Sequence, residues 1–255
     1  MAQAVGCRLT LHGFNSHPWL HFTLIMLRRF QKGEHKMEEK DDFLRLSQSL
    51  IDKTVTKGEL LNRVKQDFGL IPLLLKGVDH PKAAVRYGCS KVLMDLSEEH
   101  PEKLYPNFGF FVNLLDSNYR ILKWTALAII ANLARVDTDK KFDAVFGKYY
   151  SFLDDEYMVT VANVVGNSGK IALAKPYLIP EVTEELLKVK DLSITPHLTE
   201  ECRRVIAQHA IKTFDLFFDR IDQKDQVISF VKLHLDSPRK KLCTAAEKFL
   251  RKWAD

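Results

Sequence analysis

The sequence is poor in cysteine, glycine and proline. Of its 255 residues only 4 are Cys, and none of them stands in Cys-x-x-Cys spacing, which excludes a disulfide scaffold and a zinc module. The 11 Gly and 9 Pro do not gather in low-complexity runs, so a fibrous or linker-dominated protein is excluded as well. Since 46% of the residues are apolar, the chain can build a substantial core. These features predict a soluble globular protein of the cytoplasm.

The sequence also lacks the motifs of the common enzyme classes. It contains no Gly-x-x-x-x-Gly-Lys, Gly-x-Gly-x-x-Gly, Gly-x-Ser-x-Gly or His-Glu-x-x-His. The nearest approach is Gly166-Asn-Ser-Gly169, which we interpret as loosening the end of a helix. The dispersed histidines suit surface or capping roles, and Cys89, Cys202 and Cys243 suit packed small side chains. We therefore predict no enzymatic activity, no metal and no cofactor.

A broad field of positive charge is missing too. The net charge is +5, from 38 Lys and Arg against 33 Asp and Glu, but the excess lies at the two ends of the chain. Residues 1–36 contain five basic residues and one acidic residue, and residues 237–255 contain six basic and two acidic residues. The remainder is slightly acidic, which weighs against a phosphate-binding surface over the whole body.

The amino-terminal segment 1–36 differs from the rest of the chain. Its apolar run, Leu24 to Leu27, is far too short for the ~20 residues of a membrane helix, and it has no small-residue cleavage site of a signal peptide. We expect residues 1–36 to be an extension, either disordered or upstream of a natural start at Met37, with a targeting segment or a packed helix as alternatives. The folded domain is predicted at 37–255.

From residue 39 onward the apolar spacing is helical. Leu122, Ala126, Ile129 and Leu133, for example, form one stripe on a helix. No stretch has the strict alternation of a half-buried strand, and no Asn-Gly or Asp-Gly hairpin turn is present. The fold class is therefore predicted to be all-α.

A helical unit of about 40 residues recurs along this domain. Each unit has an aliphatic residue followed by Asp at its central turn, at Asp79, Asp116, Asp154 and Asp236, and the last interval spans two units. We expect these Asp carboxylates to cap the helix that follows. The predicted units are 59–98, 102–135, 138–173, 176–219 and 222–253, with a capping helix at 39–52.

The pattern resembles the HEAT-repeat family of armadillo-type superhelices. The resemblance rests on an aliphatic and a basic residue six and seven positions after the turn Asp, as in Val85-Arg86, and on a small residue ten positions after it, as at Cys89 and Ala126. The third unit departs with Val161 at the basic position, and the fourth has His197 in place of Asp. The resemblance implies a right-handed α-α superhelix of about five helical hairpins, whose second helices line a concave groove.

The groove positions are those opposite the buried stripe of each second helix. Tyr87 and Trp124 are equivalent in the first two units, where they are expected to form an aromatic pair, and Glu98 aligns with Arg135. The candidate partner-binding residues are Tyr87, Lys91, Met94, Trp124, Arg135, His209, Lys212, Lys248 and Arg251.

These residues favour a non-enzymatic scaffold or adaptor that holds a protein or peptide, acidic or amphipathic, along the groove. Two alternatives stay open. One is a DNA-binding HEAT-like protein resembling the alkylpurine DNA glycosylases, although no catalytic Asp can be transferred onto this sequence. The other is a regulatory subunit with a large apolar interface. No association with a membrane is expected.

Overall fold

The computed structural model describes residues 41–254, and the chain divides into two units at residue 49. Residues 41–51 are helical, within the predicted capping helix. The predicted boundary between the extension 1–36 and the folded domain lies outside the described residues.

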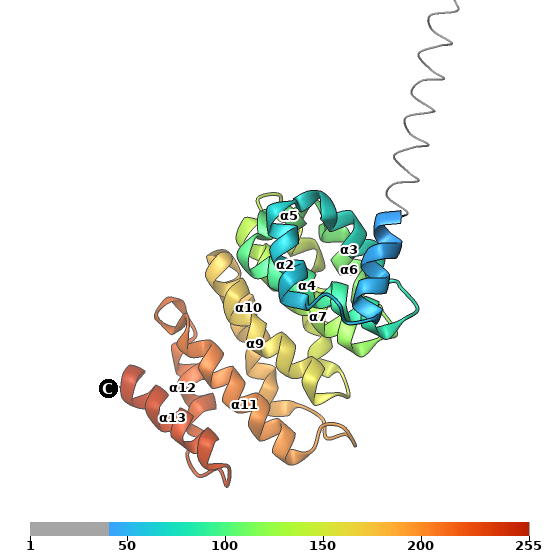
Figure 1. Cartoon of the computed structure of the whole chain (residues 1–255). Helices are drawn as coiled ribbons and strands as arrows, with labels where there is room; N and C mark the ends of the chain where they lie inside the picture. Colours follow the sequence, from blue (N-terminus) through green and yellow to red (C-terminus); the bar gives the residue numbers. More distant parts are fainter. Residues whose placement is uncertain (1–40, 255) are drawn as a thin grey trace, which may run out of the picture. The chain divides into compact units, whose positions relative to one another are not determined.

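The unit from residue 50 to residue 254 is built of helices (Figure 1), with a single isolated bridge between Thr195 and Leu198. The α-helices are α2 (Lys57–Gln66), α3 (Ile71–Val78), α4 (Ala83–Glu99), α5 (Pro101–Leu104), α6 (Phe108–Leu114), α7 (Arg120–Leu133), α8 (Phe146–Tyr150), α9 (Met158–Ala174), α10 (Ile179–Leu187), α11 (Glu200–Asp215), α12 (Lys224–Lys232) and α13 (Lys240–Trp253). The 3₁₀ turns are Phe68–Leu70, Tyr105–Asn107, Ala134–Val136, Asp143–Val145, Ser151–Asp154, Pro176–Leu178, Lys188–Asp191 and Phe218–Arg220.

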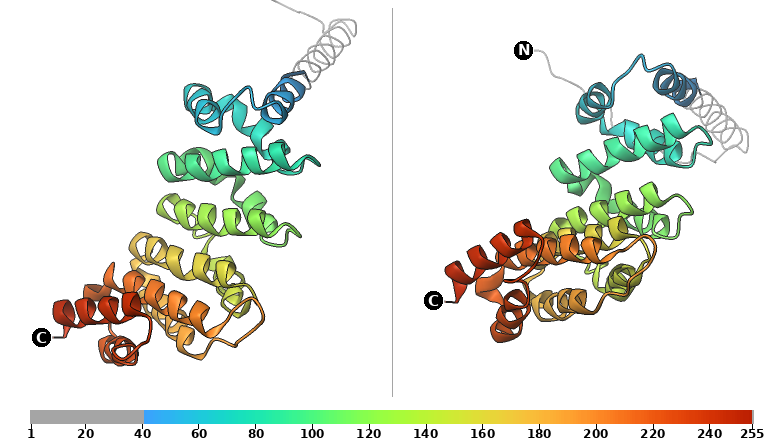
Figure 2. Two further views of the ribbon diagram at one scale, coloured as in Figure 1. Left: turned by 60° about the horizontal axis from the view of Figure 1, so that its bottom comes forward. Right: turned by 90° about the horizontal axis from the view of Figure 1, so that it is seen from below.

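The predicted all-α superhelix is confirmed. Each unit ends in a long helix, and these five long helices are α4, α7, α9, α11 and α13. Every long helix packs on the next one along the chain, so that they lie like successive rungs in the left view of Figure 2. Because each unit covers the apolar side of its neighbour, one continuous core runs through the stack.

In units one to four the first half is not one straight helix, whereas in the fifth unit it is the single helix α12. In the second unit, α5 is followed by a 3₁₀ turn that contains Pro106, and only then does α6 begin. Proline has no N–H to donate and clashes with the preceding turn, so the chain changes direction there. Pro72, Pro176 and Pro180 likewise stand in the first turns of helical segments. The predicted hairpins of units one to four therefore have three segments, a short one, a middle one and a long one.

The apolar stripe read from the sequence of α7 is the core. Leu122, Ala126, Ile129 and Leu133 are all at most 2% exposed. The close packing of α3 against α4 also requires a glycine at one position. A Cβ on Gly77 in α3 would lie 2.4 Å from the buried Sγ of Cys89 in α4. The two helices of the first unit can pack this closely only because residue 77 has no side chain.

The predicted capping role of the turn Asp residues is wrong. Each lies three residues before the N-cap of its long helix, too early to reach the free N–H groups. The residue after the Asp instead forms a turn that leads into the helix: the Tyr119 N–H donates to Ser117 Oγ at 3.1 Å, and the Tyr157 N–H donates to Asp155 Oδ1 at 2.8 Å. Asp116 bonds to Lys148 of the next unit at 2.7 Å.

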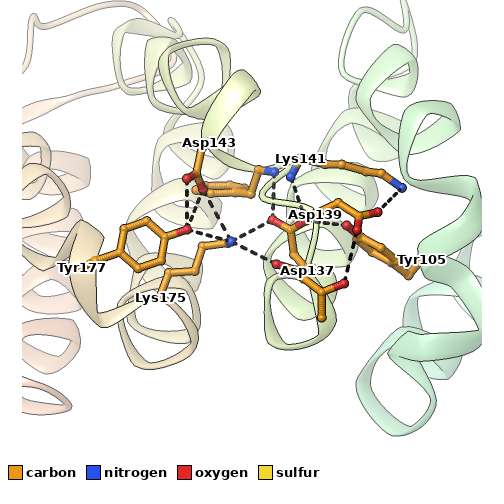
Figure 3. Close-up of polar contacts among 9 residues, drawn as sticks. Tyr105, Asp137, Asp139, Lys141, Asp143, Lys175 and Tyr177 are labelled. Atoms are coloured by element: carbon orange, nitrogen blue, oxygen red, sulfur yellow. Dashed lines mark hydrogen bonds and ion pairs between the residues drawn. The ribbon is translucent and has the colours of Figure 1, made fainter.

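A polar cluster with a buried centre joins the linkers between units two, three and four (Figure 3), and we call it the linker clamp. Its centre is the ion pair of Lys175 Nζ and Asp137 Oδ2 at 2.8 Å, whose side chains are 3% and 0% exposed. Tyr105 of the second unit donates to Asp137 at 2.6 Å, and the Tyr177 hydroxyl bonds to both Asp143, at 2.9 Å, and Lys175, at 3.1 Å.

Every charge in the centre of the linker clamp has partners, and the protonation states follow from them. Burial by itself would raise the pKa of Asp137, but hydrogen bonds from Lys175, Tyr105 and two main-chain N–H groups hold that pKa below its usual value. Burial would lower the pKa of Lys175, but its bonds to Asp137 and Tyr177 hold it above the usual value. Both groups therefore stay charged at neutral pH, as a structural tie rather than an acid–base pair.

Candidate binding groove on the inner face

The candidate residues all lie on or directly after long helices. We call the side of these helices opposite the buried stripe the inner face. Six of the nine predicted residues are exposed there, and Tyr87, Met94 and Trp124 are half-buried. The exposed ones are Lys91, Arg135, His209, Lys212, Lys248 and Arg251. Lys91 forms an ion pair with Asp95 one turn along α4.

The predicted aromatic pair is not formed. Trp124 lies in the seam between α7 and α9, where its Nε1–H donates to Thr160 Oγ1 at 3.0 Å. Tyr87 belongs to another hollow, of about 460 Å³, which Leu50, Val55 and Ala84 also line. Trp124 is therefore both a packing residue and, on its uncovered side, part of the inner face.

Apolar side chains lie on the first two turns of the long helices on this face. Ile121 of α7 and Val159 of α9 stand at equivalent positions and are 44% and 43% exposed. One turn further, Trp124, Ala162 and Val205 are equivalent and half-buried. We call these five residues the apolar row. Exposed aliphatic residues at matched positions of neighbouring units make a continuous strip that suits a protein ligand.

The middle of the inner face is lined by small residues. Ala128 of α7 is 9% exposed, and Gly166, twelve residues after its own turn Asp as Ala128 is, is exposed on α9. A Cβ on Gly166 would meet nothing within 4 Å, so open space lies above this part of the helix. The sequence motif around Gly166 thus belongs to the middle of α9 and does not loosen its end as expected.

Four polar residues meet at the far end of the long helices, and we call them the inner-face cluster: Glu98, Asn132, Arg135 and Lys170. With Leu173 and Ala174 they line a hollow of about 460 Å³. The residues come from three successive units, so the hollow extends across units one to three.

The hydrogen bonds of the inner-face cluster centre on Asn132. Its amide donates to Ser97 Oγ at 2.8 Å and its carbonyl oxygen accepts from Lys170 Nζ at 2.8 Å. Lys170 also bonds to Glu98 Oε1 at 3.3 Å, and Arg135 donates to the main-chain carbonyl of Glu98. The cluster thus holds two cations and one carboxylate.

Of this cluster, the sequence pointed to Arg135 and Glu98 and missed Asn132 and Lys170. Both missed residues stand sixteen positions after their turn Asp, on the flank of the helix between the inner face and the preceding unit. A search restricted to the side directly opposite the buried stripe passes over this flank. Their shared register was the signal that could have found them.

Positive charge dominates the inner face toward the carboxyl end. Lys212 of α11 and Lys248 and Arg251 of α13 carry this charge, and His209 stands one turn before Lys212. Partial burial, together with the charges on Lys212 and Arg239, lowers the pKa of His209, so this imidazole is neutral at pH 7.

Other features of residues 41–254 do not converge on this face. A hollow of about 510 Å³ on the side of α10 and α12 is lined by Leu187, Phe230 and Leu233 among others. Within the described part of the chain no group of three or more His, Cys, Asp or Glu is placed to hold a metal ion. No helix there is long and apolar enough to span a bilayer.

Among the solved structures that resemble this one are two designed armadillo repeat proteins. The designed armadillo repeat protein YIII(Dq)4CqI has a TM-score of 0.55 at 20% sequence identity, with 81% of this chain and 92% of that protein covered. A second designed armadillo repeat protein, YIII(Dq.V1)4CPAF in complex with the peptide (KR)4, has a TM-score of 0.53 at 16% identity, with 85% and 93% covered. No family model and no curated protein sequence gave a match. The likeness shows that the chain has the armadillo-type repeat fold.

Proposed function

We propose that this protein is a non-enzymatic scaffold that binds an extended segment of a partner protein along its inner face. The observation that carries the proposal is the apolar row, in which Ile121 and Val159 stand exposed at matched positions above packed helices. Exposed aliphatic side chains in register along a rigid surface are costly to leave in water and suit an apolar ligand.

The packing of the row makes it suitable for binding. Trp124 is held in place by its hydrogen bond to Thr160, so its ring offers a large apolar surface that loses little conformational entropy when a ligand covers it. The small residues Ala128 and Gly166 leave room beside the row for the main chain of a ligand. A designed repeat protein of the same fold is known in complex with a peptide, which supports this use of the fold.

The partner is proposed to be an acidic or amphipathic segment. The inner face is apolar on the first turns of its helices, whereas Arg135, Lys170 and Lys212 lie toward the other end. A segment with apolar side chains on one edge and carboxylates on the other matches both halves, and the charge would speed its association.

The test is to select peptides from a display library of random 12-residue peptides on the full chain, and to compare two variants. Gly166→Arg places a long side chain over the inner face, into space where a Cβ meets nothing. Gly109→Arg is the matched control, because Gly109 is an exposed glycine of α6 whose Cβ also meets nothing within 4 Å.

We expect the selected peptides to bind the wild type and the Gly109→Arg variant equally, and to lose at least about tenfold in affinity for the Gly166→Arg variant. No enrichment from the library, or an equal loss in both variants, would overturn the proposal.

DNA binding is the alternative function, since Lys212, Lys248 and Arg251 could contact phosphates. It is supported less well, because the apolar row and Glu98 occupy the same face. Binding of a DNA duplex with an affinity that falls steeply with salt would favour it over the protein partner.

A further inference from the structure

We infer that the inner-face cluster is a recognition site for a carboxylate side chain of the bound segment, which takes the place now filled by Glu98. This inference rests on the proposed function and specifies its partner, since it assigns an acidic residue to one place in the groove. It is carried by how Lys170 and Arg135 are held, by which group contacts them now, and by the electrostatics of the helix ends.

Lys170 is a positioned cation. Its ammonium is bonded to the carbonyl oxygen of Asn132, which is 2% exposed and is itself fixed through its amide to the buried hydroxyl of Ser97. Surface lysines usually lose side-chain entropy when they engage an anion, whereas this one is already placed by a buried side chain. An ammonium has three protons, and Asn132 and Glu98 accept two.

Arg135 supplies the second cation from the neighbouring helix. One nitrogen of its guanidinium donates to the main-chain carbonyl of Glu98. A guanidinium has five N–H donors in a planar fork that matches a carboxylate, so the remaining ones can serve an incoming acid.

Glu98 is an internal occupant of the same site. Its carboxylate touches Lys170 at 3.3 Å and its side chain is 57% exposed, so this ion pair contributes little to stability and is readily replaced. A carboxylate from a partner can occupy the hollow beside Leu173, where both cations are within reach of one small volume. Glu98 therefore competes with the ligand and weakens its binding.

The position of the site makes the two cations essential. The hollow lies at the carboxyl ends of α4, α7 and α9, where the helix dipoles place partial negative charge. An anion is repelled there unless Lys170 and Arg135 outweigh the dipoles. Removing either cation should therefore cost more affinity for an acidic ligand than removing a basic residue elsewhere on the surface.

The experiment measures binding of two fluorescein-labelled peptides, (DLSG)3 and (NLSG)3, to the full chain by fluorescence anisotropy. The peptides differ only in carboxylate against amide. The variants are Lys170→Met, Arg135→Met and Glu98→Gln, with Lys188→Met as the control, since Lys188 is an exposed lysine at the end of α10 that pairs with Glu185.

We expect (DLSG)3 to bind wild type about tenfold more tightly than (NLSG)3, and Lys170→Met or Arg135→Met to remove most of that difference. Glu98→Gln should tighten binding of (DLSG)3 several-fold and leave (NLSG)3 unchanged, a gain that misfolding cannot produce. Lys188→Met should change neither.

Equal binding of the two peptides, or no effect of Lys170→Met and Arg135→Met on their difference, overturns the carboxylate site. If the two peptides bind the wild type with equal affinity but do not bind the Gly166→Arg variant, the proposed groove is retained and only the carboxylate site is wrong. If neither these peptides nor any library peptide binds, the proposed function fails with it.

Discussion

The linker clamp and the inner-face cluster are two polar groups that each join three successive units, yet their environments are opposite. In the linker clamp the Lys175–Asp137 pair is buried, and the carboxylate of Asp137 also accepts hydrogen bonds from Tyr105 and from main-chain N–H groups. In the inner-face cluster Lys170 and Glu98 are 41% and 57% exposed. A buried ion pair between units therefore holds those units together, whereas the charged groups of a pair in an open hollow can change partners.

The largest expected difference concerns stability. Asp137→Ala leaves Lys175 buried without its partner and should cost about 3–5 kcal/mol of unfolding free energy. Glu98→Ala removes a carboxylate from an exposed pair and should cost about 0–1 kcal/mol. Chemical denaturation of both variants measures these losses of unfolding free energy. Equal losses would mean that the buried and the exposed ion pair contribute equally to stability.

The glycines sharpen the same contrast between packed and open parts. Gly77→Ala forces a Cβ against the Cys89 sulfur in a closed seam and should cost about 1–3 kcal/mol. Gly166→Ala adds a methyl group in open space within α9 and should stabilise the protein by about 0.5–1 kcal/mol, because alanine favours the helix. Thermal unfolding should show shifts of opposite sign. A loss of stability for Gly166→Ala would show that the inner face is filled.

Acid should weaken the linker clamp in a defined pH range. Because the pKa of Asp137 lies below the ordinary 3.8, its stabilisation is complete above that value and is lost as the pH falls through the lowered pKa. The raised pKa of Lys175 means that its share is complete below 10.5 and is lost only as the pH rises beyond that.

The unfolding free energies of wild type and Asp137→Asn should therefore differ by a constant amount from about pH 5 to pH 9 and converge below about pH 4. Urea denaturation across this range tests the expectation. A difference that persists undiminished to pH 2 would contradict the lowered pKa.

The smallest effect is expected at Trp124, which belongs to both the seam and the inner face. Thr160→Val removes the acceptor of the indole N–H and should cost about 0.5–1.5 kcal/mol. Thr244→Val on α13, at an exposed position, should stay within about 0.5 kcal/mol of wild type. If Thr160→Val also weakens peptide binding, the seam positions the ring for its ligand; unchanged binding would assign the hydrogen bond to packing alone.

The fold was predictable because its signal repeats. The stripe of Leu122, Ala126 and Ile129 and the recurring turn Asp indicate a stacked helical unit without further information. The capping role assigned to the Asp residues failed, since helix-end chemistry depends on which residue is the N-cap, and a shift of a few residues changes it.

The sites were predictable only in part. Arg135 follows from its place opposite the core stripe, but Asn132 acquires its role from Ser97 and Lys170 on two other helices. The linker clamp likewise combines side chains far apart in the sequence: Asp137 and Lys175 share a repeat position, 21 residues after Asp116 and Asp154, but Tyr105 comes from another part of its unit. Contacts made between units depend on the spacing and twist of the stack, which a one-dimensional pattern does not contain.

Because the linker clamp fastens units two to four together, the stack should not bend evenly under load. We expect the contacts of Tyr105, Asp137 and Lys175 to make the middle of the protein a stiff block, with more compliant joints to the first and fifth units. The inner-face cluster spans units one to three, so its alignment depends on the joint at the edge of this block. Strain imposed at the carboxyl end would then leave the spacing of the apolar row little changed. Strain imposed at the amino end would alter the distance between Glu98 and Lys170.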